Sequence, residues 1–77
     1  MTNEIWETSD LPLASALVSK GFKINEIEKD GDKAFFVFEG SEALQLSVND
    51  YWNDCLMVNA KKMAETIRTL KSRIYST

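Results

Sequence analysis

Apolar residues alternate with polar ones in some stretches and recur every three or four residues in others, which predicts a mixture of strands and helices. Weak alternation over residues 4–8 predicts a short first strand with Ile5 or Trp6 facing inward. Two further stretches, residues 22–27 and 33–38, have the composition of strands. The sheet is therefore expected to combine an N-terminal strand with a neighbouring pair.

The turn between the second and third strands has a strong local signal. Asp30 and Gly31 are a pair typical of tight hairpin turns. The second strand starts with period two but loses it at Ile27, so either a bulge lies near Asn25 or the strand ends before the turn. The third strand is apolar on both faces, which is typical of a central strand or one covered on each side.

Three helices are predicted from apolar residues at helical spacing. The first lies between a cap at Ser9 or Asp10 and a stop at Gly21, the second starts at Ser41, and the third follows a cap at Asn59. Their apolar stripes are, in turn, Leu13, Ala14, Leu17 and Val18; Leu44, Val48, Tyr51 and Trp52; and Ala60, Met63, Ala64, Ile67, Leu70, Ile74 and Tyr75. Each stripe is expected to pack on a shared core.

Residues 55–58 are too few to classify by periodicity; an edge strand is expected, with an extended connector as the alternative. Cys55 is expected to be a small buried residue beside Leu56 and Met57. The order β-α-β-β-α-(β)-α indicates an α+β fold, with a small antiparallel or mixed sheet of three to four strands and helices packed against it. A chain of 77 residues has room for one domain, residues 1–77.

Composition is that of a globular protein, with 44% hydrophobic and 27% charged residues. No apolar run approaches the roughly 18–20 residues that span a bilayer, and the acidic start Met1-Thr2-Asn3-Glu4 is unlike a secretory leader. A cytoplasmic protein is therefore expected. With one cysteine and no histidine, the chain forms no internal disulfide and lacks the ligands of the commonest zinc sites.

The sequence carries no recognisable catalytic motif. Ser41, Ser47 and Cys55 are candidate nucleophiles, but the chain has no histidine to activate them. It also has no glycine-rich phosphate loop and no Gly-x-Ser-x-Gly turn. We therefore expect neither an enzyme nor a cofactor or metal site.

Charge is distributed unequally along the chain. Residues 59–77 contain five basic and one acidic residue, a net charge of +4, while residues 1–58 carry −7. The candidate binding residues on the polar side of the last helix are Lys61, Lys62, Arg68 and Arg73. Tyr51 and Trp52 can flank this surface, or can equally act as lids over the core. A plain alternative is that the basic helix is simply solvated.

The aromatic stretch Lys33–Phe38 has a faint likeness to the third strand of RNA-recognition domains, whose exposed rings stack on bases. The acidic first 58 residues and the absence of that motif's glycines speak against such a role. Packing of these phenylalanines in the core is the simpler interpretation.

Several short stretches together resemble a small uncharacterised domain family of bacteriophages and of bacterial genomes that carry mobile elements. They are residues 8–11 and 13–17, Gly21-Phe22, residues 36–39 and 50–53, residues 58–60 and residues 70–75. The resemblance implies a phage or mobile-element setting and an intracellular host compartment. It implies no activity and no binding residues.

The expected function is that of a non-enzymatic accessory or regulatory protein of phage origin, which binds a macromolecule, protein or nucleic acid, through the basic face of its last helix. One alternative is an acidic inhibitor of a host protein or defence complex that imitates nucleic acid. Another is a self-associating structural module. No membrane partner is expected.

Overall fold

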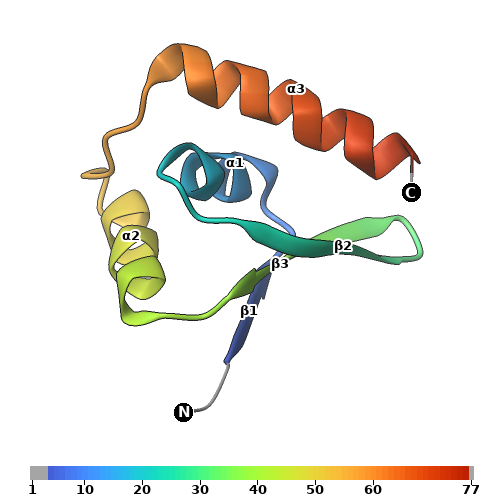
Figure 1. The fold of residues 1–77 in the computed structure, drawn as a ribbon, viewed down its shortest axis with the longest axis horizontal. Coiled ribbons are helices and arrows are strands. Elements are labelled where there is room, and N and C mark those ends of the chain that lie inside the picture. Colours follow the sequence, from blue (N-terminus) through green and yellow to red (C-terminus); the bar gives the residue numbers. More distant parts are fainter. Residues whose placement is uncertain (1–3, 77) are drawn as a thin grey trace.

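The computed structural model describes residues 4–76, which form an antiparallel sheet and three helices in the order β-α-β-β-α-α (Figure 1). The strands are β1 (Ile5–Thr8), β2 (Ile24–Asp30) and β3 (Lys33–Glu39). The helices are α1 (Leu11–Ser19), α2 (Glu42–Trp52) and α3 (Ala60–Ser76). The α+β fold predicted from the sequence is confirmed. Met1–Asn3, most of the segment from which the absence of a leader was argued, lie outside the described residues.

β3 is the central strand of the sheet, between β1 and β2, as its two apolar faces predicted. Ile24 pairs with Phe38, whereas Glu26 pairs with Val37, the residue adjacent to Phe38 in β3. Asn25 is therefore the extra residue of a β-bulge. The bulge explains the broken period: both Ile24 and Ile27 pack against the core despite lying three residues apart. Of the two sequence interpretations, the bulge is correct.

The hairpin between β2 and β3 is closed by a two-residue turn. Asp30 pairs with Lys33, which leaves Gly31 and Asp32 as the turn. Gly31 has a φ of +64° whereas Asp32 has no positive φ, and this combination is typical of a type II′ turn. The hairpin is as predicted, although Asp30 belongs to the strand and not to the turn.

The helices lie on one side of the sheet, and α1 lies between the sheet and α3 (Figure 1). The core consists of Leu13, Ala14, Leu17, Phe36, Phe38, Leu44, Val48 and Leu70. Trp6 joins it, with its ring centroid 5.9 Å from that of Phe38, while Ile5 is 72% exposed. Trp6 is therefore the inward residue of β1.

Both ends of α1 are fixed by hydrogen bonds that its sequence predicts. The side chain of Asp10 accepts a backbone hydrogen bond of 2.9 Å in the first turn. At the other end Phe22 N–H donates to the carbonyl of Leu17 (3.1 Å) and Gly21 N–H to that of Val18 (3.0 Å). Gly21, with φ +109°, supplies the positive φ that this Schellman end requires.

α2 ends in the same way without a glycine. Cys55 N–H donates to the carbonyl of Asp50 (2.8 Å) and Asp54 N–H to that of Tyr51 (3.2 Å). Asp54 takes the glycine position with a φ of 59°, which makes it the one non-glycine residue among residues 4–76 with a positive φ. The turn sends the chain away from α2 toward the start of α3.

The connector from α2 to α3 corrects two expectations. Residues 55–59 form no strand, so the described sheet has three strands and the alternative of an extended connector is correct. Cys55 is exposed, not buried, with its Sγ 3.3 Å from the carbonyl oxygen of Asn53. Figure 1 shows the connector joining the end of α2 to the start of α3, away from both edges of the sheet, so it has no strand to pair with.

Candidate binding surfaces

α3 docks on α1 through a narrow side. Leu70 is 2% exposed, and the half-buried side chains on the same side are Met63, Thr66, Ile67 and Ile74. Asn59 caps the helix by accepting the Lys62 N–H at 2.9 Å, as predicted. Ala60, Ala64 and Tyr75 were predicted in the docking stripe but are exposed, with Tyr75 85% exposed. The side of α3 that docks is therefore narrower than the stripe predicted from the sequence.

The four basic residues predicted to form one surface, Lys61, Lys62, Arg68 and Arg73, are all exposed. At about 100° per residue, they nevertheless divide between two sides of the helix. Lys61 and Arg68, seven residues apart, lie on the side away from α1. Lys62 and Arg73 lie on a flank, together with Thr66 and Thr69. The structure therefore separates the predicted surface into two pairs.

The side of α3 away from α1 carries what we call the outer stripe, formed by Lys61, Ala64, Arg68, Lys71 and Tyr75. All five residues are exposed. Within residues 4–76, no ion pair occupies Lys61, Arg68 or Lys71. Three cations, one small residue and one aromatic ring thus face solvent along the length of the helix.

Tyr51 and Trp52 differ in burial although they are neighbours. Their rings form an edge-to-face pair with centroids 5.2 Å apart, but Tyr51 packs on the core whereas Trp52 is 63% exposed. Burial raises the pKa of the Tyr51 phenol, and the negative charge of Asp10 raises it further. The prediction that Trp52 belongs to the core stripe is wrong. At about 100° per residue, Trp52 lies at the edge of the stripe that contains Leu44, Val48 and Tyr51.

The aromatic pair and the predicted basic surface meet only in part. Figure 1 shows α3 beginning above the end of α2 and then running away from it. The end of α2, which contains Tyr51 and Trp52, thus lies nearer to the first turn of α3 than to its C-terminal half.

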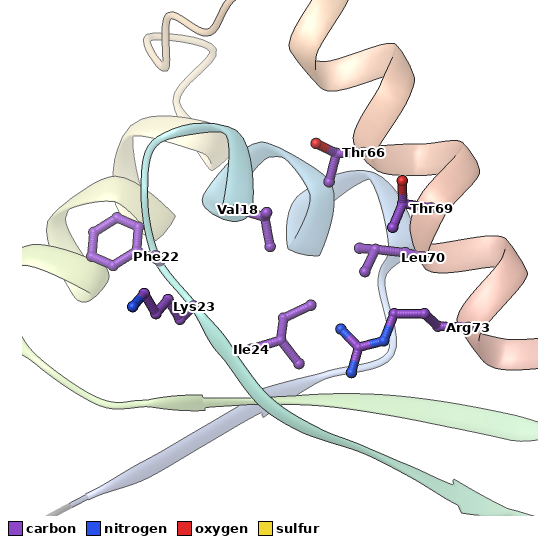
Figure 2. A pocket seen from close by; sticks show the side chains of 8 residues that line it. All are labelled: Val18, Phe22, Lys23, Ile24, Thr66, Thr69, Leu70 and Arg73. Atoms are coloured by element: carbon purple, nitrogen blue, oxygen red, sulfur yellow. The ribbon is translucent and has the colours of Figure 1, made fainter.

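A groove of about 340 Å³ lies between α3 and the segment that joins α1 to β2 (Figure 2). Its apolar wall consists of Val18, Ile24 and Leu70, whose side chains converge in Figure 2. Its other lining residues are Phe22, Lys23, Thr66, Thr69 and Arg73. Two of the eight lining residues are cationic and none is a carboxylate.

Sequence reasoning identified Arg73 but missed the groove that it lines. Figure 2 shows the guanidinium of Arg73 turned toward Ile24 across the groove. Lys23 comes from a segment fifty residues earlier that was assigned to a strand. The signal that could have found this site is the Gly21 stop, which leaves Phe22 and Lys23 in a short link between helix and strand.

The opposite face of the sheet is open and acidic. Residues paired directly across an antiparallel ladder share a face, so Glu7, Val37 and Glu26 form one row. Phe35 and Glu28 are paired in the next row, and Glu39 is next in line along β3. Because Phe36 and Phe38 point into the core, Phe35 is the one phenylalanine of β3 on this face, where it is half-buried among carboxylates that repel phosphate. This arrangement supports core packing over base stacking.

Two further features concern the described residues only. Within residues 4–76 no cluster of three or more His, Cys, Asp or Glu side chains is arranged to hold a metal ion. No helix in that range combines the length and the apolar character that a membrane span requires.

The fold defines a small α+β domain in which the helices cover one face of a three-stranded antiparallel sheet. Residues 3–76 match the family described as "Domain of unknown function (DUF5659)", and the chain belongs to this family. The resemblance to an uncharacterised domain is thereby confirmed. A comparison with curated proteins found no match, and neither did a comparison with solved structures.

Proposed function

We propose that this protein is a non-enzymatic accessory or regulatory module that binds an anionic macromolecule through the basic side of α3. The observation that supports it best is the way α3 docks. Its contact side is limited to residues around Leu70, so the outer stripe stays in solvent. A phage or mobile-element setting and a cytoplasmic location, both inferred from the sequence alone, are part of this proposal.

Charge separation gives the binding a direction. α3 and the open face of the sheet lie on opposite sides of α1 (Figure 1). Residues 59–77 have a net charge of +4, whereas the open face carries Glu7, Glu26, Glu28 and Glu39. A polyanion is attracted on one side and repelled on the other, although the net charge of the chain is −3.

A matched pair of variants tests the proposal. Lys61→Glu/Arg68→Glu reverses two charges of the outer stripe. Lys29→Glu/Lys33→Glu changes the net charge of the protein by the same amount, but on the exposed hairpin. The readouts are retention on heparin and fluorescence anisotropy with a 20-base-pair DNA duplex at 50 and 200 mM salt. We expect the outer-stripe variant to lose binding by at least tenfold and the hairpin variant to keep it, with affinity falling as salt rises.

Two outcomes would contradict the proposal: no retention of the unmodified protein at the lower salt concentration, or equal loss in the two variants. Equal loss would mean that net charge, and not the outer stripe, determines binding. Where the unmodified protein is retained on heparin, a host protein that is pulled down with it and lost with Lys61→Glu/Arg68→Glu would support the proposal with a protein as the anionic partner.

The open face of the sheet favours a second function, that of an acidic inhibitor of a host protein or defence complex. Its exposed carboxylates lie beside Val37, which is 3% exposed, and Phe35, which is half-buried. Such a row of carboxylates can imitate the charge of a nucleic-acid backbone. Under this function, Glu26→Lys/Glu28→Lys abolishes the inhibition of the host protein or defence complex in cells, while Lys61→Glu/Arg68→Glu preserves it. The opposite pattern supports the first function.

A further inference from the structure

We propose that the groove between α3 and the α1–β2 link binds an acidic protein segment that inserts one apolar side chain between Val18, Ile24 and Leu70. This inference rests on the proposed function, because it names a protein as the anionic partner of α3. It adds a site that the outer stripe does not include.

The size and the lining of the groove fit one inserted side chain. Its volume of about 340 Å³ is at the lower end of the range of small-molecule pockets. Val18 and Ile24 are half-buried and Leu70 is buried, and Figure 2 shows all three side chains turned into the groove. An apolar side chain placed there exchanges water for contacts with the half-buried Val18 and Ile24, while Leu70, 2% exposed, adds little further surface. Such an inserted side chain is the usual anchor of a peptide in a groove.

The charge around the groove selects an acidic segment. Lys23 and Arg73 are in the lining, and Lys62 lies one helical turn before Thr66 on the same flank of α3. These cations come from two regions of the chain that are far apart in sequence, and no carboxylate lines the groove. Arg73 also takes part in an interaction within the protein, so Lys23 and Lys62 are the cations on which the attraction of carboxylates beside the anchor depends.

The polar groups of the groove also suit a peptide backbone. Thr66 donates its hydroxyl hydrogen to the carbonyl of Lys62 (2.8 Å), and Thr69 donates to that of Glu65 (3.0 Å). Each hydroxyl oxygen can still accept a hydrogen bond. Backbone N–H groups of a bound peptide supply such donors, whereas phosphates supply none.

The apolar wall favours protein over nucleic acid as the occupant. A nucleotide base buried against Val18, Ile24 and Leu70 would leave its polar edge atoms without partners, which is unfavourable. A phosphate would remain at the rim and gain nothing from the wall. The groove therefore discriminates between the two kinds of anionic macromolecule in a way that the outer stripe does not.

The test uses the full chain and four probe peptides of sequence Ac-Asp-Glu-X-Gly-Glu-Asp-NH2, where X is Leu, Ile, Phe or Trp. A fifth peptide with Ser at X is the control. Binding is followed by ¹H–¹³C correlation spectra of the methyl groups of Val18, Ile24 and Leu70. We expect at least one apolar peptide to shift all three residues, with an affinity at least tenfold above that of the serine peptide. A DNA duplex should leave these methyl groups unchanged.

Two substitutions sharpen the result. Thr69→Trp places a large ring in the groove from an exposed helix position, so the fold should persist while peptide binding falls at least tenfold. Because Arg73 takes part in another interaction within the protein, Lys23→Glu is the cleaner charge test, and we expect a three- to tenfold loss. Lys29→Glu, an equal charge change on the hairpin, is the control and should retain affinity.

The failure of this inference is distinguishable from that of the proposed function. If none of the four apolar peptides shifts the groove methyl groups at millimolar concentration while DNA binds the outer stripe, the groove proposal is wrong and the proposed function stands. A peptide affinity that changes neither with Thr69→Trp nor with the residue at X also overturns the groove proposal. If neither peptides nor DNA bind, both proposals are wrong.

Discussion

α1 and α3 show how differently two helices of one small domain can contribute to it. α1 has nine residues, and five consecutive ones, Leu13–Leu17, are buried. α3 has seventeen residues but only Leu70 is buried. The difference follows from position, because α1 lies between the sheet and α3 whereas α3 covers one side of α1 only (Figure 1). The helix with the clearest amphipathic pattern is therefore the peripheral one.

The comparison also separates stability from binding. A helix that is apolar on all sides has no surface to offer to a partner, whereas a helix that docks by one stripe leaves most of its side chains available. α1 consequently supplies the core and α3 supplies the candidate surfaces. Substitutions in the two helices should affect the protein in correspondingly different ways.

The largest effect is expected from truncation in α1. Leu17 is fully buried, and its replacement in Leu17→Ala leaves a cavity between the sheet and both neighbouring helices. We expect a loss of about 3–5 kcal/mol, a large part of the roughly 4–12 kcal/mol expected for a domain of this size. Urea unfolding followed by circular dichroism measures it. A loss below about 1 kcal/mol would contradict the central role of α1.

A smaller and more local effect is expected in α3. Leu70→Ala removes the one buried side chain with which α3 holds to α1, at a cost of about 2–3 kcal/mol. Amide hydrogen exchange should rise throughout residues 60–76 while the strands keep most of their protection. Uniformly faster exchange in β3 and α3 would show instead that α3 and the sheet unfold as one unit.

Ser15 offers a test with the opposite sign. It is fully buried within α1, and its hydroxyl has no hydrogen-bond partner in the described structure. Burial of an unpaired hydroxyl is unfavourable, so Ser15→Ala should stabilise the protein by about 1 kcal/mol. Ser19→Ala is a suitable comparison, since the Ser19 hydroxyl donates to the Ser15 carbonyl at 2.8 Å. A destabilised Ser15→Ala variant would indicate that the hydroxyl is paired in solution.

The smallest effect is confined to alkaline pH. The pKa of Tyr51 is raised above its ordinary value of 10.0, so the folded protein keeps the phenol protonated at pH values at which the unfolded chain ionises it. The contribution of Tyr51 to stability is complete below about pH 10 and is lost as pH rises through the folded pKa. Urea midpoints at pH 8 and pH 10.5 should therefore fall more for the unmodified protein than for Tyr51→Phe. Equal decreases in the urea midpoints of the two proteins would contradict the raised pKa of Tyr51.

Local features of the fold could be predicted from the sequence because they depend on neighbouring residues. Asp10 and Asn59 are caps, Gly21 ends a helix, and the period of the apolar residues separates strands from helices. The bulge at Asn25 was left open because a shortened strand satisfies the same pattern. Cys55 was misplaced because the turn at Asp54, where no glycine marks a left-handed residue, redirects the chain.

The candidate surfaces were predictable only in part. That the polar side of α3 is exposed follows from its periodicity, so Lys61 and Arg68 were found. The groove joins Lys23 to Arg73 across fifty residues of sequence, and its existence depends on which helix α3 packs against. The period of the apolar residues indicates that α3 docks, but it does not indicate which element α3 docks on. The groove forms because α3 docks on α1.

The exposed thiol at the junction of α2 and α3 has a practical consequence. Cys55 is the only cysteine of the chain and is exposed, so a maleimide dye or spin label can be attached there without removing any other thiol. Cys55 lies in the connector just after α2, where its N–H donates to the carbonyl of Asp50. A label there reports on the junction between the two helices and leaves the surfaces of α3 and of the sheet unmodified. Storage without a reducing agent should, for the same reason, yield disulfide-linked pairs of chains.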